Sequence, residues 1–243
     1  MTVFAGRIAV VTGASSGIGK AIALGLAAQE ATLCLVGRKL ATLEVVAESA
    51  RAIASQVLCY RADLTLDEDI RELTARLQQD FGYIDILIHS AGVISLGQLK
   101  VAPVEDFDWQ YRINVRAPYA LTKALLPMLR SRWGQIVFIN SSVGLGAKAN
   151  VGQYAATKHA LKAIADSLRE EVNVDGLRVS SVFVGRTATR MQEAVHEMEG
   201  RVYRPERLMR PEDVATVVIN ILSLPRSAEV TDIIMRPLAK PSE

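Results

Sequence analysis

The stretch that decides the fold is "RIAVVTGASSGIGKAIALGL", residues 7–26. Residues 7–13 form a short apolar run typical of a buried strand, and apolar residues recur at helical spacing from residue 17 onward. Gly13, Gly17 and Gly19 lie between the two patterns. Glycines at such a turn let a phosphate group approach the backbone, and the start of the helix offers free N–H groups. The stretch therefore predicts a strand, a phosphate-binding turn and a helix.

A loose set of three glycines is a weak signal by itself, because a glycine-rich turn can form without any ligand. Here the glycines follow the first strand and open the first helix, which is the arrangement that phosphate binding requires. Ser15 and Ser16 add hydroxyl donors to the same turn. We therefore prefer the binding interpretation.

The alternation of strand and helix patterns continues along the chain. Further strands are predicted at 31–37, 56–63, 84–92, 134–142, 177–185 and 230–237, and helices at 17–29, 39–54, 67–81, 104–130, 153–174 and 211–223. The strands are apolar on both faces, which is typical of parallel strands buried between two helix layers. We expect one α/β domain over residues 1–243, a doubly wound, seven-stranded parallel sheet with helices on both faces. The least regular stretch is 185–210.

The composition excludes several classes of protein. Of 243 residues, 50% are hydrophobic and 22% are charged, and the net charge of +2 gives no reason to expect a nucleic-acid partner. No apolar run is long enough for a membrane span, and the first residues do not resemble a signal peptide, so we expect a cytoplasmic protein. Cys34 and Cys59 lie in strand-like runs, where buried free thiols are expected. The three histidines lack metal-ligand spacing, so no metal is predicted.

The end of the second strand indicates which dinucleotide the turn binds. NAD-binding proteins usually carry an acid there, which holds the ribose 2′-hydroxyl. This chain has Gly37 at that point, followed by Arg38 and Lys39. A guanidinium can hold a 2′-phosphate through paired hydrogen bonds, so the sequence predicts NADP(H). The alternative is that Arg38 and Lys39 are solvated residues at the start of the next helix.

Tyr154 and Lys158 are four residues apart in a predicted helix and therefore share one face. Ser141 lies thirteen residues before the tyrosine, at the end of a strand, where ligands collect in parallel sheets. A phenol needs a pKa shift of about three units to exchange protons near pH 7, and a cation about 4 Å away has an effect of that size. Ser141 can hydrogen-bond a carbonyl oxygen. The set can pass a proton to or from an alcohol oxygen, although a Tyr-x-x-x-Lys pattern alone also occurs by chance.

Together these motifs resemble the short-chain dehydrogenase/reductase family, in its single-domain branch. "TGASSGIG", residues 12–19, resembles the family's cofactor turn, and Asp63 resembles the acid that holds the adenine ring. Ala91-Gly92 resembles the end of the family's Asn-Asn-Ala-Gly motif. The resemblance covers nearly the whole chain, in order and at family spacing, and implies a Rossmann-type fold.

The resemblance also implies roles for individual residues. The implied catalytic residues are Asn114, Ser141, Tyr154 and Lys158. Ser141 is preferred over the adjacent Ser142 because the family's serine lies thirteen residues before the tyrosine and three before a glycine, here Gly144. The implied cofactor-binding residues are Gly13, Ser15, Ser16, Gly17, Ile18, Gly19, Arg38, Asp63, Leu64, Ser90, Gly92, Tyr154, Lys158 and Thr187. Thr187 is taken as the contact of the nicotinamide amide.

The implied activity is hydride transfer between NADP(H) and a small alcohol or carbonyl compound, with Tyr154 as general acid and base. Family members usually assemble as homodimers or homotetramers, so we expect the same here. One alternative is a protein that binds NADP(H) as a sensor or scaffold without turnover. Another is a sugar-nucleotide epimerase or dehydratase, which shares the Tyr-x-x-x-Lys pattern, but 243 residues leave no room for its larger substrate domain.

The chain departs from the family pattern at three places. His89 and Ser90 replace two asparagines, and Val184 replaces a proline before the nicotinamide loop. Residues 185–210 are expected to form a lid over the substrate, with six arginines against four glutamates. Such a lid could favour an acidic substrate, or its arginines could form local ion pairs on a solvated surface, which is the interpretation we prefer.

Overall fold

The computed structural model describes residues 2–54 and 56–238 and contains the parallel sheet that the sequence predicts. The expected domain also includes residues 1, 55 and 239–243, which lie outside the described residues. Seven strands pair in parallel in the order β3-β2-β1-β4-β5-β6-β7. Their bounds are β1 Ile8–Thr12, β2 Thr32–Gly37, β3 Val57–Arg61, β4 Ile86–His89, β5 Gln135–Ser141, β6 Arg178–Val184 and β7 Asp232–Met235. The order reverses between β1 and β4, so the sheet is doubly wound and the predicted fold class is confirmed.

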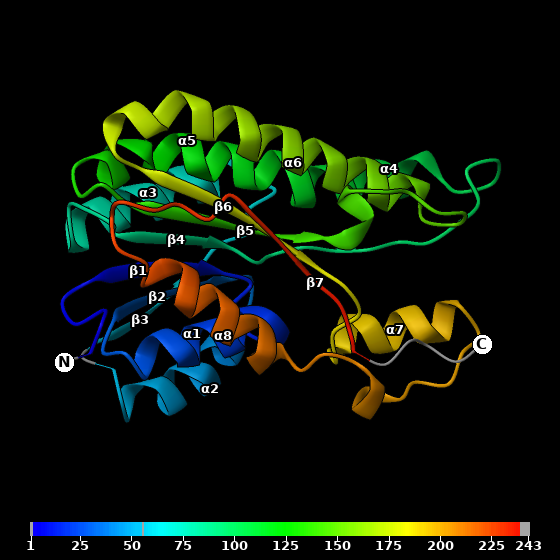
Figure 1. Cartoon of the computed structure of the whole chain (residues 1–243), viewed down its shortest axis with the longest axis horizontal. Helices are drawn as coiled ribbons and strands as arrows, with labels where there is room; N and C mark the ends of the chain where they lie inside the picture. Colours follow the sequence, from blue (N-terminus) through cyan, green and yellow to red (C-terminus); the bar gives the residue numbers. More distant parts are fainter. Residues whose placement is uncertain (1, 55, 239–243) are drawn as a thin grey trace.

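Helices cover both faces of the sheet (Figure 1). One layer holds α1 (Gly17–Ala27), α2 (Leu40–Arg51) and α8 (Pro211–Leu222). The other holds α3 (Asp67–Asp80), α5 (Ala117–Arg130) and α6 (Gly152–Val172). Two hydrophobic cores fill the space between the sheet and these layers, one on each face. The central strands β1 and β5 are buried throughout, as expected for strands covered on both faces.

The segment predicted as a helix over 104–130 contains a change of helical geometry. It begins as α4 (Val104–Tyr111), continues as a π-helical turn over Arg112–Arg116, and ends as α5. Single π-helical turns inside helices are frequent at functional sites. This one contains Asn114, which is a predicted catalytic residue.

The irregular stretch 185–210 forms a separate lobe beyond the carboxyl end of β6. It contains α7 (Arg190–Met198), which Figure 1 shows at the end of the sheet and apart from the two helix layers. The first and last segments of the lobe lie side by side. Ala188 N donates to Met209 O at 2.7 Å, and Met209 N donates to Arg186 O at 3.2 Å. The lobe is therefore fixed at its base.

Both cysteines are free thiols, as predicted. Cys34 is buried, and burial raises its pKa far above the ordinary value. Cys59 is only partly buried, unlike the expectation, and burial raises its pKa to about 11. Neither thiol is disposed to ionise near neutral pH, which fits a structural role.

Candidate active site

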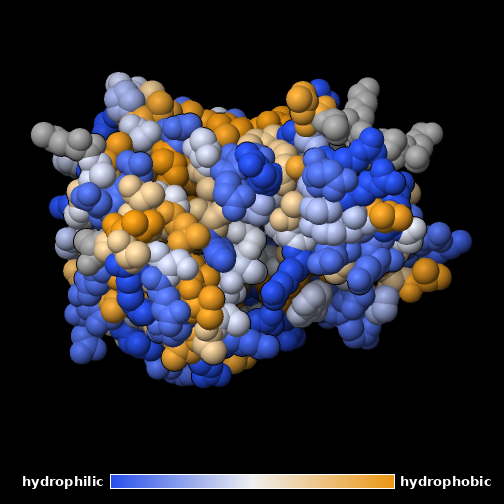
Figure 2. Space-filling view, turned by 90° about the horizontal axis from the view of Figure 1, so that it is seen from below, coloured by the Kyte–Doolittle hydropathy of each residue, from blue (hydrophilic) through white to orange (hydrophobic). Residues whose placement is uncertain are grey.

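A cavity runs along the carboxyl ends of β1, β2, β4 and β5, where ligands collect in open parallel sheets. Figure 2 shows the surface hollowed between the main body of the molecule and the largely hydrophilic lobe that carries α7. The cavity brings most of the predicted cofactor residues together. Those that line it are Gly13, Ser15, Ser16, Gly17, Ile18, Gly19, Arg38, Asp63, Leu64, Ser90, Gly92, Tyr154 and Lys158.

Two glycines make the turn between β1 and α1 possible. Gly13 has φ of +65°, and a Cβ there would lie 2.8 Å from the backbone nitrogen of Ala91. A Cβ on Gly19 would lie 2.4 Å from the carbonyl oxygen of Gly13. A side chain at Gly13 would therefore push the turn away from the chain after β4, and one at Gly19 would push the start of α1 away from Gly13. The first turn of α1 lines the cavity, and a helix N-terminus favours an anionic group.

The cavity extends past β2 and β3 to Arg38 and Asp63. The Asp63 carboxylate accepts hydrogen bonds from Thr65 N at 3.0 Å and from Thr65 Oγ1 at 2.8 Å. Burial acts to raise the pKa of Asp63, but the Thr65 hydrogen bonds and the charges of Arg38 and Arg61 outweigh it, so the pKa lies below its ordinary value. Asp63 is thus an ionised acceptor, and the positive charge of Arg38 acts on the same end of the cavity.

Tyr154 and Lys158 project from α6, and Ser141 lies at the end of β5. Ser141 hydrogen-bonds the Tyr154 phenol. The Lys158 ammonium lies 5.8 Å from the centre of the Tyr154 ring and donates to Ile139 O at 3.3 Å. Ser141 is buried, whereas Ser142 is exposed, so the structure brings Ser141 rather than its neighbour to the tyrosine. The catalytic set predicted from β5 and α6 is assembled in one place.

Gly144 explains why a glycine follows the serine by three residues. A Cβ at Gly144 would lie 2.9 Å from Asn140 Oδ1 and 3.0 Å from Lys158 O. Asn140 itself joins the two elements, because its Nδ2 donates to Lys158 O at 3.1 Å and its Oδ1 accepts from Ser141 N at 2.8 Å. The close packing of this turn on α6 therefore sets the separation between Ser141 and the helix that carries the tyrosine.

The electrostatics of the tyrosine and the lysine differ from the expectation. From the sequence, we expect the charge of Lys158 to lower the pKa of the Tyr154 phenol toward 7. Instead, burial raises the pKa of Tyr154 to about 12, and the Ser141 hydrogen bond offsets this only in part. Burial also lowers the pKa of Lys158 to about 8. The physical reason is that removal from water disfavours the charged form of both groups, which the spacing of two residues in a sequence does not reveal.

Asn114 does not line the cavity but stands directly behind it. Its Oδ1 accepts from Val93 N at 2.9 Å, and its Nδ2 donates to Val93 O at 2.9 Å and to Thr157 Oγ1 at 3.1 Å. A Cβ on Gly92 would meet Asn114 Oδ1 at 3.4 Å and Lys158 Nζ at 3.9 Å. Asn114 therefore holds the chain that lines the cavity against α6.

His89, which replaces an asparagine of the family pattern, points into the core. It stacks on Phe138 with ring centres 4.9 Å apart and shares a 2.7 Å hydrogen bond with Thr122. Burial lowers the pKa of His89 to about 3, so the ring is neutral at physiological pH. These contacts give His89 a structural role. The next residue, Ser90, donates its backbone N–H to Thr12 Oγ1 at 3.1 Å.

The structure does not bring Thr187 to the cavity. Its side chain is buried at the base of the lobe, where Oγ1 donates to Gly185 O at 3.1 Å. Thr189, two residues later, lines the cavity instead and accepts from Gln192 N at 3.2 Å as the N-cap of α7. A Cβ on Gly17 would lie 3.1 Å from the Thr189 methyl group, so Thr189 packs on the cofactor turn. The sequence reasoning missed Thr189, and its position just before a helical pattern was the available signal.

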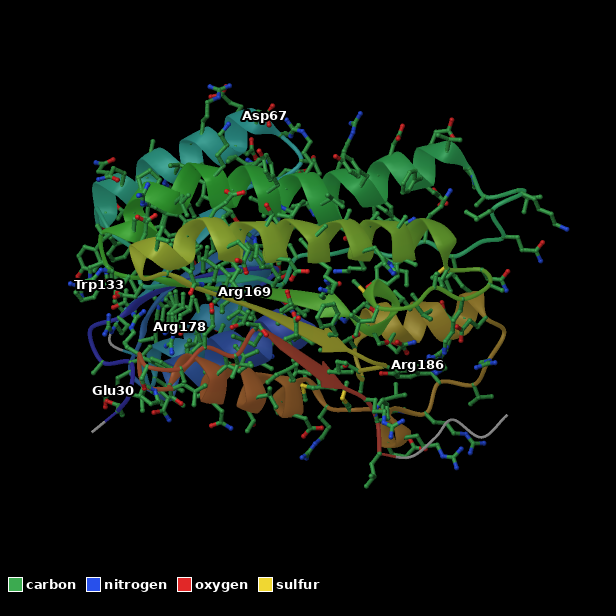
Figure 3. All side chains as sticks on the ribbon, turned by 45° about the horizontal axis from the view of Figure 1, so that its top comes forward. Glu30, Asp67, Trp133, Arg169, Arg178 and Arg186 are labelled. Carbon is green, nitrogen blue, oxygen red and sulfur yellow. The ribbon has the colours of Figure 1, made fainter. Side chains whose placement is uncertain are left out.

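Several lid arginines are held in local ion pairs, in line with the surface interpretation. Arg186 lies at the base of the lobe (Figure 3) and pairs with both carboxylate oxygens of Glu199, at 2.6 and 2.7 Å. Arg210 pairs with Asp213 at 3.3 Å. Arg190 lines the cavity. Val184, in place of the family's proline, continues β6 and also lines the cavity.

Two negative observations apply to the described residues. They contain no group of three or more histidine, cysteine or acidic side chains placed to hold a metal ion. Among the helices of the described ranges, none has the length and apolarity needed to cross a bilayer.

Replacing Lys158 by methionine should stabilise the fold at neutral pH. The folded pKa of about 8 lies below the ordinary 10.5, so the unfolded chain binds more protons between these values and stability rises with pH across that window. Below pH 8 the buried ammonium costs up to about 3 kcal/mol, which Lys158→Met recovers. Urea unfolding at pH 7 should show a higher free energy of unfolding for Lys158→Met than for the wild type. This difference should shrink as the pH approaches 10.

Lys162→Met is the matched control, because Lys162 lies on the same helix in a partly exposed pair with Asp166 and should change stability by less than about 1 kcal/mol. A Lys158→Met protein less stable than the wild type at pH 7 would show that the hydrogen bond to Ile139 outweighs the burial of the charge.

Comparisons with known proteins identify the family of the chain. The model of the family described as short chain dehydrogenase matches residues 7–200. An uncharacterised oxidoreductase of Staphylococcus aureus strain MRSA252 is 32% identical over 98% of this chain and 100% of its own length. The alcohol dehydrogenase of the archaeon Thermococcus sibiricus, solved with 5-hydroxy-NADP, is 26% identical with a TM-score of 0.88, over 98% of this chain and 99% of its own.

Gluconobacter frateurii L-sorbose reductase, solved with NADPH and L-sorbose, is 26% identical with a TM-score of 0.86, over 97% of each chain. The family match spans most of the chain, and the curated relative exceeds 30% identity over nearly its full length. The chain therefore belongs to the short-chain dehydrogenase family of oxidoreductases.

Proposed function

We propose that this oxidoreductase transfers a hydride between NADP(H) and a small alcohol or carbonyl compound, with Tyr154 as general acid and base. The observation that carries the proposal is that Tyr154 and Lys158 line the same cavity as the glycine turn, with Ser141 hydrogen-bonded to the Tyr154 phenol. A proton-transfer group next to a dinucleotide site is what alcohol oxidation and carbonyl reduction require.

The residues present fit a phosphorylated dinucleotide. The glycine turn and the start of α1 would hold the pyrophosphate, Asp63 the adenine, and Arg38 the 2′-phosphate. We assign the cofactor contact expected of Thr187 to Thr189, because Thr189 lines the cavity and packs against Gly17 of the glycine turn. The solved relatives with NADP or NADPH support the choice of cofactor. When bound, NADP(H) supplies or accepts the hydride.

The chain's own residues handle the proton. With its pKa raised to about 12, Tyr154 carries its proton at neutral pH and can give it to a carbonyl oxygen during reduction. Ser141 donates a hydrogen bond to the same oxygen and stabilises the charge that develops there. Lys158, cationic below its pKa of about 8, stabilises the phenolate left behind.

The substitution Tyr154→Phe tests the acid–base role. It removes the proton donor and keeps the ring, so kcat/KM for carbonyl reduction should fall about 10²- to 10⁴-fold. NADPH and NADH oxidation would be followed with ketones, aldehydes, diketones and 3-oxo acids. Tyr119→Phe, on the exposed face of α5, should leave the rate unchanged. Tight NADPH binding without turnover by the wild type would favour the sensor alternative instead.

Arg38→Ala tests the choice between NADP and NAD. Loss of charge-assisted hydrogen bonds to a 2′-phosphate should raise the Kd for NADPH roughly ten- to a hundredfold and leave that for NADH nearly unchanged. Calorimetric titration measures both constants. Lys39→Ala is the matched control, because Lys39 is the adjacent exposed cation and is not among the residues that line the cavity. If both variants raised the Kd for NADPH by the same factor, a specific contact between Arg38 and the 2′-phosphate would be contradicted.

We also propose that a second copy of the chain covers the outer face of α4 and α5, in a homodimer or homotetramer. Tyr111 and Tyr119 are 46% and 53% exposed there, and both line a groove with Val115 and Ala120. Exposed aromatic side chains gathered along one helical face mark protein contacts.

Tyr119→Glu places a charge in that face and should shift the mass measured by light scattering toward the monomer. Trp133→Glu changes another exposed aromatic, which lies after the end of α5 (Figure 3) and does not line the groove, and should leave the mass unchanged. A monomeric wild type, or equal effects of both variants, would contradict the proposed contact.

A further inference from the structure

The chain after β4 crosses the active site without regular structure and is held by side-chain amides from the neighbouring helix. Asn114, in the π-helical turn, bonds both the N–H and the C=O of Val93, as a neighbouring strand would. Its remaining bond reaches Thr157 of α6. We call this set, Val93–Asn114–Thr157, the inner rung.

Gln110 makes a second connection of the same kind one helical turn earlier, and the activity described above gives it no role. Its side chain is fully buried, with 0% exposure. Its Oε1 accepts from Ser95 N at 3.0 Å, and its Nε2 donates to Gln153 Oε1 over a longer 3.4 Å. Gln153 in turn donates to Pro103 O at 2.8 Å. We call the set Ser95–Gln110–Gln153 the outer rung.

The two rungs end next to the two catalytic residues of α6. Thr157, at the end of the inner rung, immediately precedes Lys158, and its hydroxyl also donates to Tyr154 O at 2.8 Å. Gln153, at the end of the outer rung, immediately precedes Tyr154. Residues four apart share a helix face, so α6 and the continuous helix formed by α4 and the π-helical turn present matching pairs to each other and to the chain between them.

The rungs hold different parts of that chain. Val93, on the inner rung, lines the cavity that we assign to the cofactor. Ser95, on the outer rung, lies beyond the residues that line it. The segment that follows packs on the start of α6, because a Cβ on Gly152 would lie 2.9 Å from Leu99. Residues 95–103 thus form a wall beside the first turn of α6, which carries Tyr154.

We propose that Gln110 is a positioning residue of the active site, which fixes this wall at a set distance from Tyr154 and so places the carbonyl substrate. The inference rests on the proposed function. A buried amide that loses its partner is costly, so the rung is formed as a whole or not at all. A displacement of the wall by about 1 Å would be enough to misalign a substrate.

A double-mutant cycle with Gln110→Met and Gln153→Met tests the proposal. Methionine keeps the length of glutamine and removes its hydrogen bonds. Each single variant should raise KM and lower kcat for the best carbonyl substrate, with kcat/KM down about tenfold. Because one rung is lost in either case, the double variant should also fall about tenfold rather than a hundredfold. The Kd for NADPH, measured by calorimetry, should stay within about twofold.

Gln78→Met, an exposed glutamine on α3, is the matched control and should change none of these quantities. Additive losses in the double variant, or a Kd for NADPH that rises in step with the loss of kcat/KM, would overturn the proposal. If Gln110→Met does not fold, Gln153→Met carries the kinetic test alone, because its side chain is only partly buried.

Amide hydrogen exchange of peptides that cover 93–103 separates this proposal from the proposed function. Faster exchange, to the same degree in both single variants and the double, would support the rung. Unchanged exchange would overturn it. A wild-type protein that turns over no carbonyl compound would overturn the proposed function and the kinetic role of Gln110, whatever the exchange shows.

Discussion

The close contact between the turn after β1 and the chain after β4 is the constraint on which the rest of the site depends. Thr12 Oγ1 accepts hydrogen bonds from Ser90 N at 3.1 Å and Ala91 N at 3.2 Å, and Gly13 leaves no room for a side chain between the two segments. The two strands are neighbours at the point where the strand order reverses. The turn that we propose to bind the cofactor and the chain that leads into the proposed substrate wall are thereby fixed relative to each other.

The second feature that shapes the site is the burial of two ionisable side chains away from water. Tyr154 and Lys158 are both held in surroundings that favour their neutral forms. At neutral pH the buried Lys158 ammonium lowers the stability of the fold, whereas Tyr154 is neutral in the folded and the unfolded chain alike. Functional sites commonly retain groups that cost stability. The same burial strengthens electrostatic interactions between these groups and a reacting oxygen. The loss of stability caused by Lys158 and the chemical usefulness of the buried site therefore have one cause, which is burial.

Much of this could be predicted from the sequence, because strand and helix patterns and the glycine turn are local features. The family, the sheet and the placement of its seven strands are confirmed. The residues of the glycine turn, Asp63, Tyr154 and Lys158 meet at one cavity, although their roles remain predictions. These positions follow from the rule that the carboxyl ends of parallel strands share one edge.

What the sequence could not reveal depends on contacts between distant segments. The π-helical turn and the amide rungs arise from bonds between α4, α6 and the chain after β4. Thr187 was predicted from the sequence, but Thr189 lines the cavity instead, because the fold of the lobe turns Thr187 toward Gly185 O. The neutral, core-facing state of His89 likewise depends on Phe138 and Thr122, which lie far away in the chain.

The rungs have one further consequence, for how the wall can change over evolution. Asn114 and Gln110 bond the backbone groups of Val93 and Ser95, and Gly97 N donates to Asn150 O at 2.8 Å. Every residue type except proline offers the same N–H, so these backbone bonds survive most exchanges of side chains along the wall. Ser95 is an exception, because its hydroxyl also donates to Asp106 Oδ2 at 2.6 Å. Selection could therefore retune which molecules are accepted at this surface while the catalytic geometry is inherited intact.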